Sequence, residues 1–153
     1  SIKLLNLKKV IWAITKKNPL KKSPFFSLTL RKKLCRKLIK GHKKIQFNYY
    51  EDKLKSKTSI ALVKFLKKRY KYKIFFIIGS DNLINFHKWK NYKELLKLSI
   101  LVVFSRKGFD TKAKKSVIMK NLKNKNIKFL KNLKIDISST RLRSKIINGS
   151  KKN

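Results

Sequence analysis

Short apolar runs take turns along the chain with stretches in which apolar residues recur at helical spacing. A continuous or alternating run of apolar, β-branched and aromatic residues predicts a strand, because successive side chains point to opposite faces of a sheet. Five segments have this character: Val10–Thr15, Ile45–Tyr50, Ile74–Ile78, Ile100–Phe104 and Ile127–Phe129. The run at Ile74–Ile78 is apolar throughout, which predicts that it is the most buried strand, covered on both faces.

Between these runs, apolar residues recur three and four positions apart, which gives a helix one apolar face. Helices are predicted over Ser27–Lys40, Thr58–Tyr70, Asn82–Phe86, Tyr92–Leu98, Ala113–Leu122 and Ser138–Ile147. Strands that alternate with helices predict an α/β fold with a mostly parallel sheet flanked by helices. Since no long linker interrupts the pattern, we expect one domain over residues 1–149 and a frayed basic tail at 150–153.

Polar turns follow three of the predicted strands. Asn18–Lys21 follows the first of them, Gly79-Ser80-Asp81 follows the third and Ser105-Arg106 follows the fourth. Ligands of open parallel sheets bind beyond the carboxyl ends of the strands. We therefore expect these turns to share one edge of the sheet and to form the ligand-binding region.

The charge of the chain is extreme but evenly spread. The 153 residues include 44 Lys and Arg against 6 Asp and Glu, a formal net charge of +38. Such a balance is typical of proteins that bind nucleic acid or anionic membranes. However, only six of the basic residues are Arg, the residue that base readout and bidentate phosphate contacts prefer. This favours a codon bias over a dedicated polyanion-binding protein.

Other classes of protein are excluded by composition. Hydrophobic residues make up 42% of the chain, which is too many for a disordered polycation. No apolar run approaches the roughly 20 residues of a transmembrane helix, and Ser1–Lys9 lacks the apolar core of a signal peptide. The single cysteine, Cys35, excludes an internal disulfide framework and a cysteine-based zinc cage. The expected location is the cytoplasm.

Three motifs could carry chemistry. The hydroxyls and arginines of Ile137–Arg143 open a helix, where backbone amides and the helix dipole attract an anion. Gly79 would let a ligand approach the backbone, and Asp81 could accept hydrogen bonds from ribose hydroxyls. Phe86–Trp89 places an aromatic plane beside cationic groups, which suits a flat anionic ring. Each motif also has a purely structural interpretation: a helix cap, a turn and a packing cluster, respectively.

The remaining polar groups give weaker signals. His42 and His87 are the only histidines, and neither has metal-ligand spacing to Cys35 or to the acidic residues. Glu51 and Asp52 follow the second predicted strand, and adjacent strand residues point to opposite faces. We therefore interpret this pair as a strand end and not as paired acid–base carboxylates.

Taken together, the motifs NPLK, IIGSDNLINFHKW, VVFSRKG and ISSTRLR resemble, in this order, those of bacterial nicotinate-nucleotide adenylyltransferases. The resemblance runs from about Leu4 to Gly149. It implies a Rossmann-like nucleotidyltransferase fold and the transfer of an adenylyl group from ATP to nicotinate mononucleotide, with Mg²⁺. It implies nucleotide partners, with no specific nucleic acid and no membrane.

The resemblance also implies roles for individual residues. Trp89 would stack on the nicotinate ring, while Thr58 and the backbone near His87–Lys90, with His87 and Lys88 among the binding residues, would hold the nicotinate carboxylate. Asp81 and Gly79 would bind the sugar region. The ATP phosphates would be held by Lys21, Ser138, Ser139, Thr140 and Arg143.

The sequence departs from the family in two places. Family members begin with a strand and a loop that ends in His-x-Gly-His, and these 153 residues contain neither, so no catalytic residue is assigned. Such a strand would lie in the middle of the sheet, and its absence would leave both neighbouring strands unpaired. In addition, Ile60 and Ala61 stand where the family usually has Asp and Thr.

Two other hypotheses stay open. A basic protein that binds RNA or a membrane surface, on a catalytically retired nucleotide-binding fold, predicts a continuous lysine face and salt-sensitive binding. A related nucleotidyltransferase could use a different acceptor, although Trp89 among positive charges favours an acidic pyridine ring.

Overall fold

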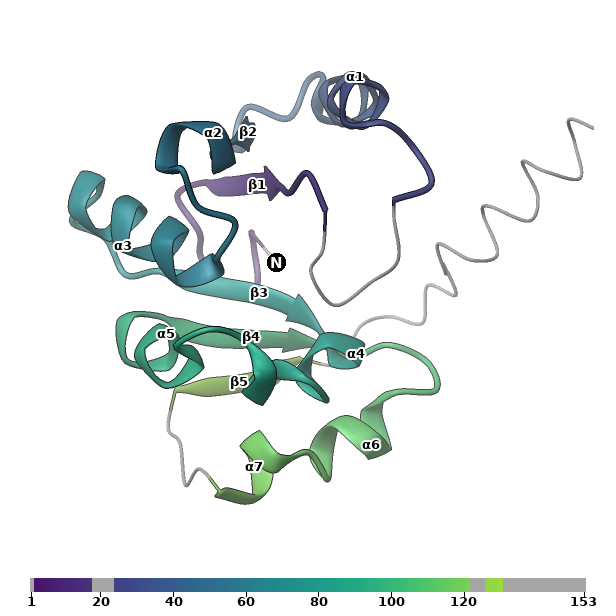
Figure 1. Ribbon diagram of the computed structural model, residues 1–153, viewed down its shortest axis with the longest axis vertical. Helices are drawn as coiled ribbons and strands as arrows, with labels where there is room; N and C mark the ends of the chain where they lie inside the picture. Colours follow the sequence, from purple (N-terminus) through teal and green to yellow (C-terminus); the bar gives the residue numbers. More distant parts are fainter. Residues whose placement is uncertain (1, 18–23, 122–125, 131–153) are drawn as a thin grey trace, which may run out of the picture. The chain divides into compact units, whose positions relative to one another are not determined.

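The computed structural model of the chain describes residues 2–17, 24–121 and 126–130. The described residues form two compact units, which fall within Ser1–Leu66 and Lys67–Asn153; Figure 1 shows their elements. The predicted helix Ser138–Ile147 and the tail at 150–153 lie outside the described residues. The assignment of residues 1–149 to one domain stays a prediction.

The first unit is built around a parallel pair of strands, β1 (Val10–Ile14) and β2 (Ile45–Tyr49). Helix α1 (Leu28–Ile39) connects them and packs on β2. It begins at Ser27, whose hydroxyl accepts a hydrogen bond from the Leu30 N–H at 3.2 Å, and Gly41 follows its end with φ of +85°. Both strands and α1 confirm their predictions to within a residue.

Two helices follow β2: α2 (Glu51–Leu54) and α3 (Ser59–Arg69). The interpretation of Glu51 and Asp52 as a strand end pointing to opposite faces is therefore wrong. Acidic residues are favourable in the first turn of a helix, where they face the positive end of its dipole. The helical turn brings both carboxylates to one partner, because the Tyr49 hydroxyl lies 3.5 Å from Glu51 Oε2 and 3.0 Å from Asp52 Oδ1.

The second unit contains a three-stranded parallel sheet in the order β3 (Phe75–Gly79), β4 (Ile100–Phe104), β5 (Ile127–Leu130). Figure 1 shows the three arrows pointing the same way. The prediction that the run at Ile74–Ile78 is the most buried strand is wrong, because Ile77 is 36% exposed. The most buried strand is β4, which lies in the middle of this sheet and has three consecutive residues without exposed surface.

Among the described residues, β1 has a ladder partner only in β2, and β3 has one only in β4. Each of these strands thus lies at an edge of its own sheet.

Five short helical elements belong to the second unit: α4 (Ser80–Leu83), the 3-10 turn η1 (Phe86–Lys88), α5 (Tyr92–Leu98), α6 (Asp110–Lys114) and α7 (Val117–Asn121). Helices α4 and α5 pack on the strands, whereas α6 packs on α4 and α7 packs on η1. The predicted helix over Ala113–Leu122 is wrong in its continuity. Its segment ends one helix at Lys114 and begins another at Val117, and the carbonyl of Ser116 accepts from the Lys120 N–H at 3.0 Å. The fully buried Phe86, Leu83 and Leu95 join β4 in the core.

Candidate functional site

The candidate site lies at the carboxyl edge of the second sheet. Figure 1 shows α4 at the heads of β3 and β4, as expected for a chain that turns directly from strand into helix. Ser80 opens α4 and is completely buried, and its hydroxyl accepts a hydrogen bond from the Arg106 N–H at 3.0 Å. This bond joins the turn after β3 to the turn after β4.

Asp81 and Arg106 form an ion pair across these two turns. Arg106 Nη1 lies 2.7 Å from Asp81 Oδ2, and the side chains are 34% and 13% exposed, respectively. The strand register explains the meeting, because Gly79 pairs with Phe104 and each partner of the ion pair lies two residues beyond. The carboxylate is therefore largely buried, charge-paired and at the place where a ligand of a parallel sheet would bind.

Gly79 leaves room for this carboxylate. A Cβ atom at Gly79 would lie 2.5 Å from Asp81 Oδ1 and would meet nothing else but the Asp81 carboxyl carbon. Its φ of −84° is open to any residue, so the glycine is needed here for space and not for backbone freedom.

Asp110 fastens the turn after β4. Its carboxylate accepts hydrogen bonds from the Ser105 hydroxyl and from the Arg106 N–H, the latter at 2.9 Å. The hydrogen bond from Ser105, together with that from the Arg106 backbone, lowers the pKa of Asp110 below its usual value, against the opposing effect of burial. Asp110 therefore holds both the Ser105 side chain and the Arg106 backbone of this turn in place.

Trp89 lies in an aromatic cluster of the second unit. Its ring centroid lies 5.1 Å from that of Phe86 and 6.1 Å from that of Phe76, in tilted and edge-on arrangements. Trp89 and His87 are half-buried and Lys88 is exposed. His87 Nδ1 is buried and has no hydrogen-bond partner in the described part of the chain. The cluster combines a packed ring with polar groups that a bound ligand could use.

Two backbone amides of the turn that contains Trp89 already donate hydrogen bonds within the chain. The N–H groups of Lys88 and Trp89 donate at 3.0 Å to the carbonyls of Asn85 and Phe86. A carboxylate held by the backbone here would compete with these bonds, so these two amides are poor candidates for holding it.

Thr58 belongs to the first unit and sits at the start of α3. Its hydroxyl accepts from the Ala61 N–H at 3.4 Å and lies 3.0 Å from the hydroxyl of Ser56. These contacts are those of a helix cap. Ile60, where the family usually has Asp, is buried at 5% exposure and belongs to the core.

The predicted phosphate-binding residues are not placed. Lys21, Ser138, Ser139, Thr140 and Arg143 lie outside the described residues. Of the residues predicted to bind the pyridine nucleotide, Gly79 and Asp81 are in contact at the sheet edge, and His87, Lys88 and Trp89 form the neighbouring turn. Their roles toward a ligand stay predictions.

The described residues do not fit a resident Mg²⁺. They contain no group of three His, Cys, Asp or Glu side chains that could hold a metal ion. The carboxylates of the site also have partners, because Asp81 pairs with Arg106 and Asp110 accepts from Ser105 and Arg106. In proteins, Mg²⁺ commonly arrives on substrate phosphates with several of its waters.

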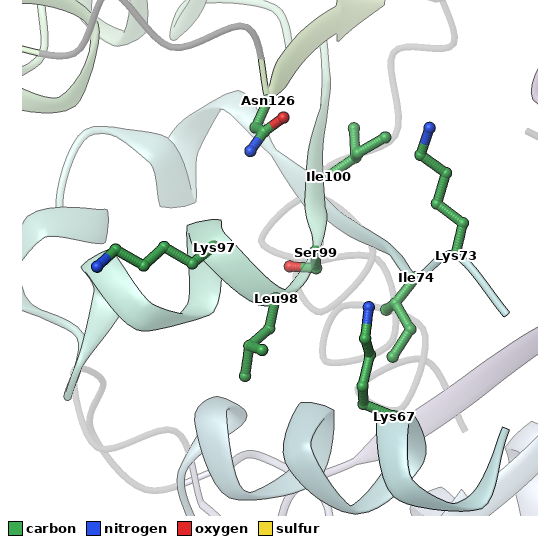
Figure 2. Close-up of a pocket in the computed structure, with 8 residues that line it drawn as sticks. All are labelled: Lys67, Lys73, Ile74, Lys97, Leu98, Ser99, Ile100 and Asn126. Carbon is green, nitrogen blue, oxygen red and sulfur yellow. The ribbon is translucent and has the colours of Figure 1, made fainter. Parts of the chain in front are cut away.

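A basic pocket of about 150 Å³ lies at the opposite edge of the same sheet. It is lined by the residues at the amino ends of the three strands together with Lys67, Lys73 and Lys97. Figure 2 shows the amine of Lys97 pointing away from the other two lysines. These lysines are exposed, so the pocket lacks a buried charged group that would mark a built anion site. No described helix is long and apolar enough to cross a membrane.

Comparisons with known proteins place the chain in a family. The family model described as "Cytidylyltransferase-like" matches residues 1–145. A protein from Pelagibacter ubique, named "Probable nicotinate-nucleotide adenylyltransferase", is 42% identical over 141 residues, which is 92% of this chain and 78% of the relative. The chain belongs to the nicotinate-nucleotide adenylyltransferase family. An Aquifex aeolicus member with the same name is 34% identical and aligns with 88% of this chain and 83% of its own length.

Solved structures agree on the fold. A Plasmodium falciparum nicotinic acid mononucleotide adenylyltransferase complexed with NaAD matches 95% of this chain and 75% of its own, with a TM-score of 0.67 at 19% identity. The complex of the same protein with APC matches 90% and 68%, with a TM-score of 0.65 at 16% identity. The predicted Rossmann-like nucleotidyltransferase fold is thus confirmed.

Sequence reasoning placed Arg106 in the turns of the ligand-binding region but gave it no specific role, and it did not single out Asp110. Their signal is weak but visible: both follow the most buried strand within six residues, and an acidic residue is rare in this chain. What the sequence could not supply was the partner of each, which depends on the register between β3 and β4.

Proposed function

We propose that this chain transfers the adenylyl group of ATP to nicotinate mononucleotide, forming nicotinate adenine dinucleotide and pyrophosphate in NAD biosynthesis. The observation that carries the proposal is the 42% identity to a relative of that name over 92% of the chain. The motifs with predicted roles fall within the matched region. A cytoplasmic location suits an ATP-consuming enzyme with a single cysteine.

In the proposed reaction, a phosphate oxygen of nicotinate mononucleotide attacks the α-phosphorus of ATP. The new P–O bond forms as the bond from the α-phosphorus to the bridging oxygen breaks, and pyrophosphate leaves with that electron pair. Such a transfer needs positioning and charge neutralisation more than a protein nucleophile. ATP would enter as its magnesium complex, which supplies part of the neutralising charge.

The residues of the chain would act by binding and orienting. Trp89 would stack on the pyridine ring, supported by Phe86 and Phe76. The Asp81 carboxylate would accept hydrogen bonds from a ribose of the dinucleotide. Side-chain groups of Thr58, His87 and Lys88 would hold the nicotinate carboxylate, because the amides of Lys88 and Trp89 already have partners. The ATP phosphates would be held by Lys21, Ser138, Ser139, Thr140 and Arg143.

The two tryptophans of the chain allow a direct test of the ring pocket. Trp12→Phe leaves Trp89 as the sole tryptophan, and Trp89→Phe leaves Trp12 in β1 as the matched control. We expect nicotinate mononucleotide to quench Trp89 fluorescence with saturation in the first variant and to leave the second unchanged. Ribose 5-phosphate, titrated at the same moderate salt concentration, controls for unspecific attraction to the +38 chain.

A folded Trp12→Phe variant without saturable quenching would contradict the proposal, as would equal quenching by ribose 5-phosphate. Chromatography of nicotinate adenine dinucleotide and pyrophosphate, formed from ATP with Mg²⁺, then tests the transfer itself. Binding of RNA that competes with the nucleotide and weakens steeply with salt would favour the alternative polyanion-binding function.

A further inference from the structure

We propose that Arg106 is a positioning residue that fixes the Asp81 carboxylate in the orientation required for the ribose of the dinucleotide. The inference rests on the proposed function and adds to it a residue to which the family resemblance assigned no role. It is carried by the ion pair across the two turns, by the glycine beside it and by the way in which the Arg106 backbone is held.

The Asp81 carboxylate needs a fixed partner where it lies. With 13% of its side chain exposed, it has lost most of its hydration, and a buried carboxylate is stable only when it is paired or hydrogen-bonded. Its Oδ2 receives that partner from Arg106 at 2.7 Å, while Oδ1 lies beside Gly79 and accepts a long hydrogen bond from Asn82 Nδ2 at 3.5 Å. The ion pair thus occupies one oxygen and leaves the other, on the glycine side, with only this long hydrogen bond, and we expect the ribose hydroxyl to bind there.

Arg106 is itself well anchored. Its N–H donates to Ser80 Oγ at 3.0 Å and to Asp110 Oδ1 at 2.9 Å, and Ser80 is completely buried. Its guanidinium carbon lies 5.7 Å from the ring centroid of Phe109. An arginine fixed at its backbone and guided by a ring restricts the rotamers of the carboxylate that it binds, which reduces the entropy lost on ligand binding.

The experiment measures binding of nicotinate adenine dinucleotide by calorimetry to the full chain and to Asp81→Asn, Arg106→Met and the double variant. We expect each single variant to weaken binding by about tenfold, the effect typical of losing one charge-assisted hydrogen bond. The double variant should weaken it little further, because both changes remove the same oriented carboxylate. Arg106→Lys should restore part of the affinity.

Two further variants separate positioning from charge and from stability. Gly79→Ala removes no charge but places a methyl group against Asp81 Oδ1, so it should weaken binding as well. Arg69→Met is the matched control, because Arg69 also lies over a ring, that of Tyr70 at 5.8 Å, and should leave binding within twofold. Circular dichroism verifies that each variant folds.

The outcomes are distinct. Additive losses in the double variant would mean that Arg106 contacts the ligand itself, and tighter binding by Arg106→Met would mean that it competes with the ligand; either overturns the inference. So does unchanged binding by a folded Arg106→Met when the parent binds. A folded parent that binds neither this dinucleotide nor nicotinate mononucleotide contradicts the proposed function and the inference with it.

Discussion

The carboxyl edges of the two sheets use an arginine in opposite ways. In the first unit, Arg31 donates to three main-chain carbonyls: Thr15 at 2.8 Å, Lys16 at 2.7 Å and Phe26 at 3.2 Å. In the second unit, the Arg106 guanidinium binds a side-chain carboxylate at the end of β3. Arg31 thus holds main-chain carbonyls in place, whereas Arg106 holds a side-chain carboxylate that is proposed to bind a ligand.

The acidic residues follow the same division. Glu51 and Asp52 of the first unit meet the Tyr49 hydroxyl, and Glu51 Oε2 also accepts from the Lys16 N–H at 3.0 Å. Asp81 and Asp110 of the second unit meet Arg106. Four of the six acidic residues of a chain with 44 basic ones thus lie at these two edges. In so basic a chain, the position of the acids is more informative than that of the lysines.

The largest expected effect is on the free energy of unfolding, whose dependence on pH should differ between variants at the two sheet edges. Asp110→Asn should lower the free energy of unfolding by about 1–2 kcal/mol at pH 7, a value reduced for partial exposure. Because the pKa of Asp110 is lowered in the folded state, this contribution is present above about pH 4 and is lost as the pH falls through the folded value. Urea denaturation from pH 7 to pH 3 should show parent and variant converging.

Asp52→Asn is the control for that series, since it removes a carboxylate from the exposed edge of the first unit. A constant difference between Asp110→Asn and the parent at all pH values would show that the charge of Asp110 is not what stabilises the turn.

A smaller effect is expected from the backbone-binding arginine. Arg31→Met should destabilise the chain by about 1 kcal/mol, because three carbonyls lose a partner but can reach water. Arg31→Lys should recover only a minor part, since an ammonium group cannot bridge three carbonyls as the planar guanidinium does. Thermal denaturation measures both variants. Equal stability of the Lys variant and the parent would mean that charge alone matters here.

Thr58 tests whether a residue of the first unit has more than a structural role. Thr58→Val removes the cap of α3 and should cost roughly 0.5–1 kcal/mol, with Thr58→Ser restoring it. Denaturation measures the cap, and nicotinate mononucleotide binding to the same variants measures the proposed ligand contact. A loss of affinity without loss of stability would reverse the contrast between the two edges.

The smallest expected effect concerns Tyr49. Burial, followed by the nearby carboxylates of Asp52 and Glu51, raises the pKa of Tyr49 to about 12. The folded chain therefore keeps a phenol proton that the unfolded chain loses near pH 10, so this contribution to stability is full below pH 10 and fades toward pH 12. Ultraviolet titration of the parent against Tyr49→Phe should isolate one late-ionising tyrosine, and Asp52→Asn should bring its pKa down.

Regular elements were the most predictable part of the molecule. The predictions for α5 at Tyr92–Leu98 and for β4 at Ile100–Phe104 are confirmed to the residue, because apolar spacing and flanking polar residues act locally. The wrong predictions include the burial of Ile74–Ile78, which depends on neighbouring strands, and two that concern local helix starts. Asp110 begins a helix earlier than the apolar pattern suggests, and Glu51 begins a helix where a strand end was predicted. An acidic residue favours the first turn of a helix, and at these two positions it determined where the helix begins more strongly than the apolar periodicity did.

The sequence predicted several residues of the candidate site but not the contacts between them. Gly79, Asp81 and Trp89 were found from motifs, since a glycine and a carboxylate after a strand and an aromatic residue among cations are chemically distinctive. The role of Gly79 as space for a neighbouring carboxylate is a tertiary feature, because it depends on the rotamer of Asp81.

The sequence by itself determined the alternation of strands and helices, the parallel sheet and the order of motifs that marks the family. Each of these is set by side-chain chemistry over a few consecutive residues. Only the tertiary structure decided that Asp81 meets Arg106, 25 residues further along the chain. That meeting follows from the pairing of Gly79 with Phe104, and a register slip of one residue would separate the two charges. Register is a property of two strands packed together, which no single segment carries.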